Sequence, residues 1–176
     1  MRGLFLSVCA AGGLVVELWA GSGNWLLPAW SVTAFYATVV HDWRLSFFPW
    51  AIAGLILDVA YGRAFPVTAV LLLPLAVLLA RFWRREGYCR SIPTQAIPGA
   101  VLGLALCMPA LWWEGCRPEN QLGWRLMLHM GFLGLQWMVG SALLLPAVCW
   151  GLDKLAARLS LPRYQSIQQR RIEPHA

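Results

Sequence analysis

The chain has 176 residues, of which 59% are hydrophobic and only 12% are charged, and its formal net charge is +6. Soluble domains carry about 25% charged residues, so this chain could not place eleven tryptophans and long runs of Leu, Val and Ala beneath a water-exposed surface. The composition therefore argues against a soluble enzyme, a disordered chain and a free nucleic-acid-binding domain. It predicts an all-α, polytopic integral membrane protein.

Six apolar segments follow one another with short breaks. Met1 and Arg2 open the first segment as in a secretory signal, but no convincing small-x-small cleavage site follows, so we expect this segment to be retained as a span. Most segments have 16 to 18 residues, at the short end of the roughly 17–25 that cross a bilayer as a helix. The predicted spans are 3–20, 25–40, 45–61, 64–80, 96–113 and 126–151, in a membrane domain, 1–151, that precedes a basic cytoplasmic tail, 152–176.

The basic residues predict the orientation of these spans. If both termini are cytoplasmic, eleven of the fourteen Lys and Arg residues lie on the inner side, and only Arg63, Arg117 and Arg125 lie on the outer side. This bias follows the positive-inside rule, and tryptophans gather at the span ends as interfacial belts do. We therefore expect a multi-pass protein with an N-in, C-in topology.

The basic tail begins with a short amphipathic pattern. Leu155 and Leu159 share one helical face and are flanked by Lys154 and Arg158. This segment could lie on anionic lipid at the cytoplasmic face, dock a cytoplasmic partner, or act only as a solvated flank that sets the topology. The sequence leaves these alternatives open.

Ionisable side chains inside the predicted spans need an explanation, because they are costly in hydrocarbon and usually face protein or a cavity. Glu17, Asp58 and His129 are three such residues, and in the predicted orientation all lie in the outer third of the membrane. Arg63 and Thr68 could join them in an outer polar cluster. For Glu17 and His129, which lie close to span ends, snorkelling to water is the simpler interpretation.

Glycines flank the most informative of these residues, Asp58. Gly54 and Gly62 each lie one helical turn away from it, and glycines let a neighbouring helix approach closely. We therefore favour a buried polar clamp that fixes helix packing, with a substrate or ion site as the alternative. Gly99 and Gly103 form a second small-residue motif, and these residues complete the predicted packing or partner positions.

Motifs for catalysis and metal binding are missing from the sequence. The five cysteines include no C-x-x-C pair, and no H-E-x-x-H, G-x-S-x-G, paired-carboxylate or phosphate-loop pattern occurs. We therefore expect no enzyme activity, no metal and no cofactor.

A short motif in the third span resembles the MreD family of bacterial rod shape-determining membrane proteins. The stretch from Trp50 to Gly62 leads through Gly-Leu-x-x-Asp, at Gly54 to Asp58, to a glycine at the end of the span. The length, the six spans and a proline in the second span, Pro28, also fit. Pro66 departs from the pattern, because a glycine is usual after the turn.

The resemblance implies a non-catalytic scaffold of the elongasome in the bacterial inner membrane, with the fold of an energy-coupling-factor S-component. It implies binding to an MreC-like bitopic protein and, indirectly, to actin-like MreB and the peptidoglycan synthases that maintain cell shape. Gly54, Asp58 and Gly62 would be the motif positions, with a packing role that shapes the partner-binding surface.

The alternative function is that of a substrate-binding membrane subunit of a vitamin transporter of the energy-coupling-factor type. Such a subunit would use Glu17, Asp58 and His129 to line an outward-facing vitamin pocket. Two features argue against it: the first span lacks an Ala-x-x-x-Ala packing motif, and the predicted outer loops are short.

Overall fold

The fold consists of helices throughout the part of the chain that the structure, a computed structural model, describes: residues 2–23, 27–41, 43–63, 65–86, 93–115 and 124–164. Its six α-helices are α1 (Arg2–Ser22), α2 (Ala29–Val40), α3 (Trp43–Ala60), α4 (Leu73–Glu86), α5 (Ala96–Gly115) and α6 (Trp124–Arg158). A π-helical turn, η1 (Thr68–Leu72), leads into α4, and a 3₁₀ turn, η2 (Pro93–Gln95), leads into α5. The predicted all-α class is therefore confirmed.

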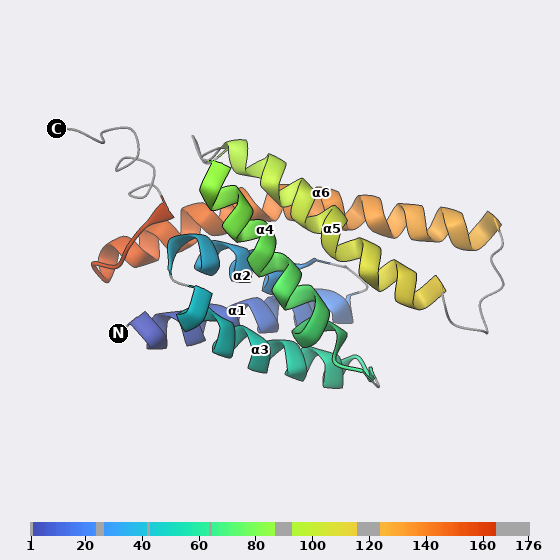
Figure 1. Ribbon diagram of the computed structural model, residues 1–176, viewed down its shortest axis with the longest axis horizontal. Helices are drawn as coiled ribbons and strands as arrows, with labels where there is room; N and C mark the ends of the chain where they lie inside the picture. The colour runs from blue at the N-terminus through green and yellow to red at the C-terminus, as the bar shows by residue number, and fades with distance from the viewer. Residues whose placement is uncertain are drawn as a thin grey trace.

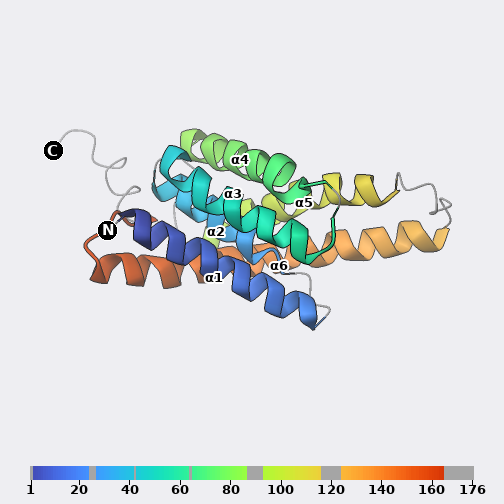
Figure 2. The ribbon, with the colours of Figure 1, turned by 90° about the horizontal axis from the view of Figure 1, so that it is seen from below.

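The helices are arranged around α2, all twelve residues of which are buried. Helices α1, α3, α4 and α6 all pack against it, while α5 lies along α6 on one side of the molecule (Figures 1 and 2). The helix begins directly after Pro28 and ends at Val40. At about 18 Å it is shorter than the roughly 30 Å hydrocarbon core, but its neighbours enclose it, so its length need not match the bilayer.

Among the described residues, three helical segments are long and apolar enough to cross a membrane: Arg2–Ser22, Trp43–Ala60 and Gly131–Arg158. Large apolar side chains also project outward from these helices, among them Trp19, Val59 and Leu143. A water-soluble domain would bury such groups. Both observations indicate a multi-pass membrane protein, whereas the number of spans and their direction stay predictions.

Two helices extend beyond the predicted segments. Helix α6 continues to Arg158, seven residues past the predicted end at position 151, because Asp153 and Ala156 are buried against the rest of the protein. The first part of the predicted tail is thus helical, with Asp153 and Ala156 buried and Lys154 and Arg158 exposed. Helix α4 continues to Glu86, six residues past the predicted end at position 80.

The core between α2 and α3 is built from two fully buried tryptophans. The indole Nε1 of Trp30 donates a hydrogen bond to the backbone oxygen of Trp50 at 3.1 Å, and the Nε1 of Trp50 donates to Thr33 Oγ1 at 3.3 Å. Buried indoles need such acceptors. These bonds therefore fix how the two helices pack.

Candidate functional site

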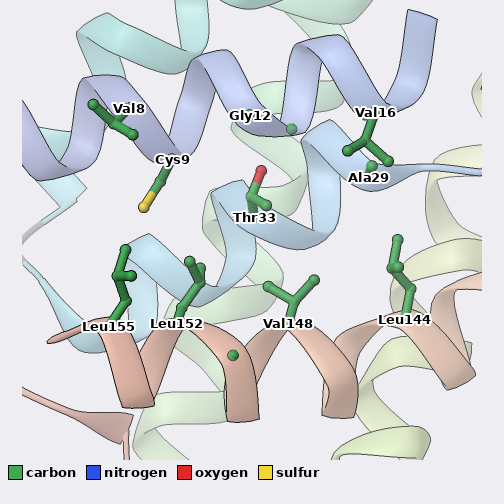
Figure 3. Close-up of a pocket in the computed structure, with 12 residues that line it drawn as sticks. Val8, Cys9, Gly12, Val16, Ala29, Thr33, Leu144, Val148, Leu152 and Leu155 are labelled. Carbon is green, nitrogen blue, oxygen red and sulfur yellow. The ribbon is translucent and has the colours of Figure 1, made fainter. Parts of the chain in front are cut away.

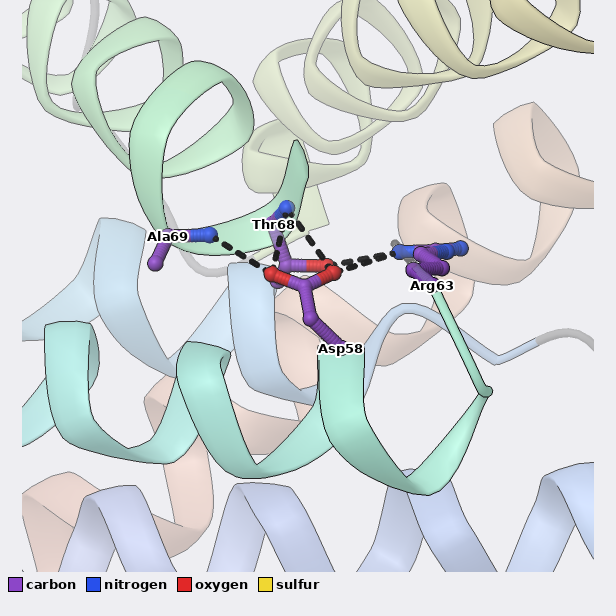
Figure 4. Close-up of polar contacts among 4 residues, drawn as sticks. All are labelled: Asp58, Arg63, Thr68 and Ala69. Carbon is purple, nitrogen blue, oxygen red and sulfur yellow. Dashed lines mark hydrogen bonds and ion pairs between the residues drawn. The ribbon is translucent and has the colours of Figure 1, made fainter. Parts of the chain in front are cut away.

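Asp58 lies in the last turn of α3 and is only 2% exposed. Its carboxylate faces the first residues of η1, the turn that leads into α4 (Figure 4). Asp58 Oδ2 accepts hydrogen bonds from the backbone N–H groups of Thr68 at 2.9 Å and Ala69 at 3.2 Å, and Oδ1 accepts one from Thr68 Oγ1 at 2.7 Å. Backbone N–H groups in a first helical turn have no partner within the helix. Asp58 therefore caps the next helix from the end of its own.

Arg63 completes this cluster from the turn between the two helices. Its Nη1 donates to Asp58 Oδ1 at 3.0 Å and to Thr68 Oγ1 at 2.7 Å, and its guanidinium carbon lies 5.2 Å from the centre of the Tyr61 ring. The side chain is 31% exposed, so water still reaches it. We call Asp58, Arg63 and Thr68, with the Ala69 N–H, the polar clamp.

Gly62 has a different role from the predicted one. Helix α3 ends at Ala60, and Gly62 lies beyond it at a φ of +61°, where a Cβ would meet nothing within 4 Å. The N–H of Arg63 donates to the Asp58 carbonyl and that of Gly62 to the Val59 carbonyl, which is the hydrogen-bond pattern of a Schellman C-cap. The prediction of a packing contact at Gly62 is wrong, because this glycine instead turns the chain so that Arg63 folds back onto Asp58.

The other three predicted glycines lie at close helix contacts. A Cβ on Gly54 would lie 3.0 Å from Trp30 Cζ2 and 3.3 Å from the Ala69 backbone. A Cβ on Gly99 or Gly103 would lie only 2.5 Å from backbone oxygens of α6. The Gly99–Gly103 motif is therefore occupied by packing of α5 on α6 within this chain and offers no surface to a partner.

Glu17 does not snorkel to water as the sequence suggested. Its Oε2 accepts a hydrogen bond of 2.8 Å from the backbone N–H of Trp30, in the first turn of α2. The residue before this helix, Pro28, provides no side-chain cap. The carboxylate from α1 thus caps α2, and the Arg63 guanidinium attracts it electrostatically.

The structure joins three of the five residues of the predicted outer polar cluster by hydrogen bonds, namely Asp58, Arg63 and Thr68. The carboxylate of Glu17 instead accepts its hydrogen bond from Trp30 in α2. The side chain of His129, on α6, lies outside the described part. Among the described residues, no three His, Cys, Asp or Glu side chains could hold a metal ion together. The carboxylates of Asp58 and Glu17 serve as helix caps.

A second buried polar network, which the sequence did not predict, lies at the other end of the helices. Asp153 Oδ1 accepts hydrogen bonds from the Tyr36 hydroxyl at 2.7 Å and from the Tyr164 backbone N–H at 2.8 Å. The Tyr164 hydroxyl donates to Gln95 Oε1 at 2.6 Å. This network attaches the end of α6 to α2 and η2. Its only signal in the sequence is one acidic residue at the start of a basic tail.

An apolar groove separates α1 from α6, with α2 as its floor (Figure 3). Its volume is about 290 Å³. Its lining residues are Val8, Cys9, Gly12, Gly13 and Val16 of α1, Ala29 and Thr33 of α2, and Leu144, Val148, Gly151, Leu152 and Leu155 of α6. The Thr33 hydroxyl already donates to the Trp30 carbonyl at 2.8 Å and accepts from Trp50 Nε1. We call this feature the α1–α6 groove, and it offers apolar contact without a free hydroxyl, amide or charged group.

Comparisons with protein-family models, with curated proteins and with solved structures find no match for this chain. Its function must therefore be inferred from its residues and their geometry.

Within the described part, these features support binding better than chemistry. The carboxylates of Asp58, Glu17 and Asp153 are all occupied by donors from the chain itself. A general acid, general base or nucleophile needs room for a substrate beside it. The α1–α6 groove has that room, but besides the hydrogen-bonded hydroxyl of Thr33 the only nucleophilic side chain in its lining is the buried thiol of Cys9. The groove therefore suits an apolar ligand such as a hydrocarbon chain or a helix.

Proposed function

We propose that this protein is a non-catalytic membrane scaffold of the bacterial cell-elongation machinery, which binds the transmembrane helix of an MreC-like partner. The motif at Gly54 to Asp58 and Gly62 suggests the family. The observation that carries the proposal is the open, apolar α1–α6 groove. In this proposal the protein lies in the inner membrane with both termini inside, has an S-component-like fold, and acts on MreB and the peptidoglycan synthases only through its partner.

The groove is suited to a helix because two of its glycines expose bare backbone. A Cβ on Gly12 of α1 or on Gly151 of α6 would meet nothing within 4 Å. Helices associate in lipid largely through van der Waals packing, and small residues allow the backbones to approach closely. Branched side chains such as Val8, Val16 and Val148 border these glycines and provide the surface that a partner helix would contact.

The polar clamp supports this function indirectly. Asp58 fixes the end of α3 to the start of the next helix, and Glu17 fixes α1 to the start of α2. Together they set the position of α1, which forms one wall of the groove. Under this proposal the motif aspartate preserves the shape of the binding surface and does not touch the partner.

The alternative, a vitamin-binding transporter subunit, has less support. A vitamin site needs a few convergent polar groups in its pocket to orient the ligand. The carboxylates of Glu17 and Asp58 are used by the chain itself, and neither residue lines the α1–α6 groove.

Co-purification from detergent tests the proposal. A tagged chain is expressed with the single-span, coiled-coil protein of MreC type from the same bacterium, and the captured partner is quantified. We expect Gly12→Leu and Gly151→Leu to reduce capture at least tenfold, because each fills the groove. Gly3→Leu and Gly131→Leu are the matched controls, since a Cβ at either position also meets nothing, and neither residue lines the groove. Equal capture by all four variants would refute the proposed site, and a vitamin retained by the wild-type chain alone would favour the transporter.

A further inference from the structure

We propose that the start of α3 and the last turns of α4 form a binding site for an anionic phospholipid, built on Trp43, Arg44 and Arg81. The sequence offers the tail as one possible contact with anionic lipid, whereas this site lies on two other helices. It goes beyond the scaffold function and does not depend on the MreC-like partner.

Two arginines from different helices gather at one indole ring. The guanidinium carbon of Arg44 lies 5.8 Å from the centre of the Trp43 ring, and that of Arg81 lies 5.7 Å from the same ring. All three side chains are exposed. Cation–π contacts hold the guanidinium groups near the ring, and guanidinium N–H groups are strong donors to phosphate oxygens. This arrangement concentrates positive charge where the two helices meet.

The surface next to these arginines is apolar. Phe48 lies one helical turn after Arg44 on α3 and is 74% exposed, and Leu78 lies one turn before Arg81 on α4 and is 61% exposed. Residues three or four apart share a helix face. Each arginine therefore stands at the border of an exposed apolar strip, and the two strips lie on neighbouring helices that contact each other.

This pattern matches the chemistry of a phospholipid. A phosphodiester head group accepts hydrogen bonds from guanidinium groups, while the acyl chains cover the apolar strips formed by Phe48 and Leu78. Basic pockets between helices on the cytoplasmic side commonly bind such head groups, and the predicted topology places this end of α3 and α4 on that side. A tryptophan at the membrane interface also suits the head-group depth. Since the apolar strips adjoin the charges, we assign the site to a lipid and not to a free phosphate.

Lipid retention in detergent tests the site, because no bilayer surface potential acts there. The purified chain is incubated with equal amounts of phosphatidylglycerol and phosphatidylcholine, and the retained lipids are measured by native mass spectrometry. We expect the wild-type chain to retain phosphatidylglycerol preferentially. The double variant Arg44→Gln with Arg81→Gln should lower this preference at least tenfold.

The matched control removes the same charge from another part of the predicted cytoplasmic face. In the double variant Lys154→Gln with Arg158→Gln, the lost side chains are also exposed, and retention should change less than twofold. Trp43→Leu keeps both arginines and should reduce retention by an intermediate amount. An equal loss of phosphatidylglycerol retention in both double variants would show that the lipid responds to total positive charge and not to this site. That result would overturn the proposal.

Two further results would also overturn it. Glycerol phosphate in excess should not displace the bound phosphatidylglycerol, and full displacement would show that the site recognises phosphate alone. Unchanged lipid retention in Arg44→Gln with Arg81→Gln, with loss of an acidic protein partner instead, would make this surface a protein interface. None of these tests uses an MreC-like protein. Failure of the lipid-site proposal can therefore be distinguished from failure of the scaffold proposal.

Discussion

Replacing Asp58 tests whether the polar clamp holds the fold together. Asp58→Leu leaves the Thr68 and Ala69 N–H groups without their acceptor in a buried position. Each unsatisfied buried donor costs about 1–3 kcal/mol, so the two N–H groups together cost about 2–6 kcal/mol. Loss of the ion pair with Arg63 adds at most about 1 kcal/mol, because that side chain is 31% exposed and can turn to water.

Asp58→Asn should have a smaller effect than Asp58→Leu, because an amide oxygen of the same shape still accepts a hydrogen bond. The lost charge weakens the bonds to Thr68 and Ala69, and we expect a loss of about 1–2 kcal/mol. Arg63→Gln is the control, since it leaves both capped N–H groups with their acceptor and should cost at most about 1 kcal/mol.

Thermal unfolding in detergent measures the order of these effects. Hydrogen–deuterium exchange shows where they act, because opening of the cap should first expose the amides of residues 67–72. If Asp58→Leu unfolds at the temperature of the wild-type chain, or if exchange rises uniformly along all helices, then Asp58 does not act as a cap and the reasoning fails.

Three further substitutions test other parts of the structure by thermal unfolding. Gly103→Ala should destabilise the chain by about 1–3 kcal/mol, because its Cβ would overlap the Trp137 carbonyl, whereas Gly131→Ala, with open space around it, should not. Gly62→Ala should cost about 1 kcal/mol from the positive φ alone, and Gly62→Asn should cost less; equal stability of all three chains would contradict the Schellman turn. Burial lowers the pKa of His41 below its ordinary value of 6.5, so the unfolded chain binds more protons and stability should fall as the pH drops below about 6.5. His41→Gln should flatten that slope, and an unchanged slope would assign it to another group.

The local part of the site was predictable because its residues are close in the sequence. Asp58, Arg63 and Thr68 lie within ten residues, and a short turn between two apolar segments brings them together whatever the rest of the fold does. Their individual roles were harder to predict, since a glycine one turn after an aspartate is compatible with either a packed helix or a helix end. Gly62 is the helix end, and only its φ decides this.

The long-range contacts could not be predicted from spacing. Tyr36 and Asp153 are 117 residues apart in the sequence, and nothing near either residue indicates the other. The role of Glu17 could not be predicted either, because the backbone N–H that it accepts from, that of Trp30, belongs to another helix. The continuation of α6 to Arg158, past the predicted span, has a related cause, because tertiary packing of Ala156 keeps that segment helical.

The enclosure of α2 has a consequence for how the chain is made. Helix α2, with twelve residues, is too short to cross the hydrocarbon core by itself. Its first turn also receives its hydrogen-bond acceptor from α1, through Glu17. The two helices are therefore expected to leave the translocation machinery as one hairpin. The later helices then pack around that hairpin. If translation stopped before α4, helix α2, which is buried in the complete fold, would face lipid.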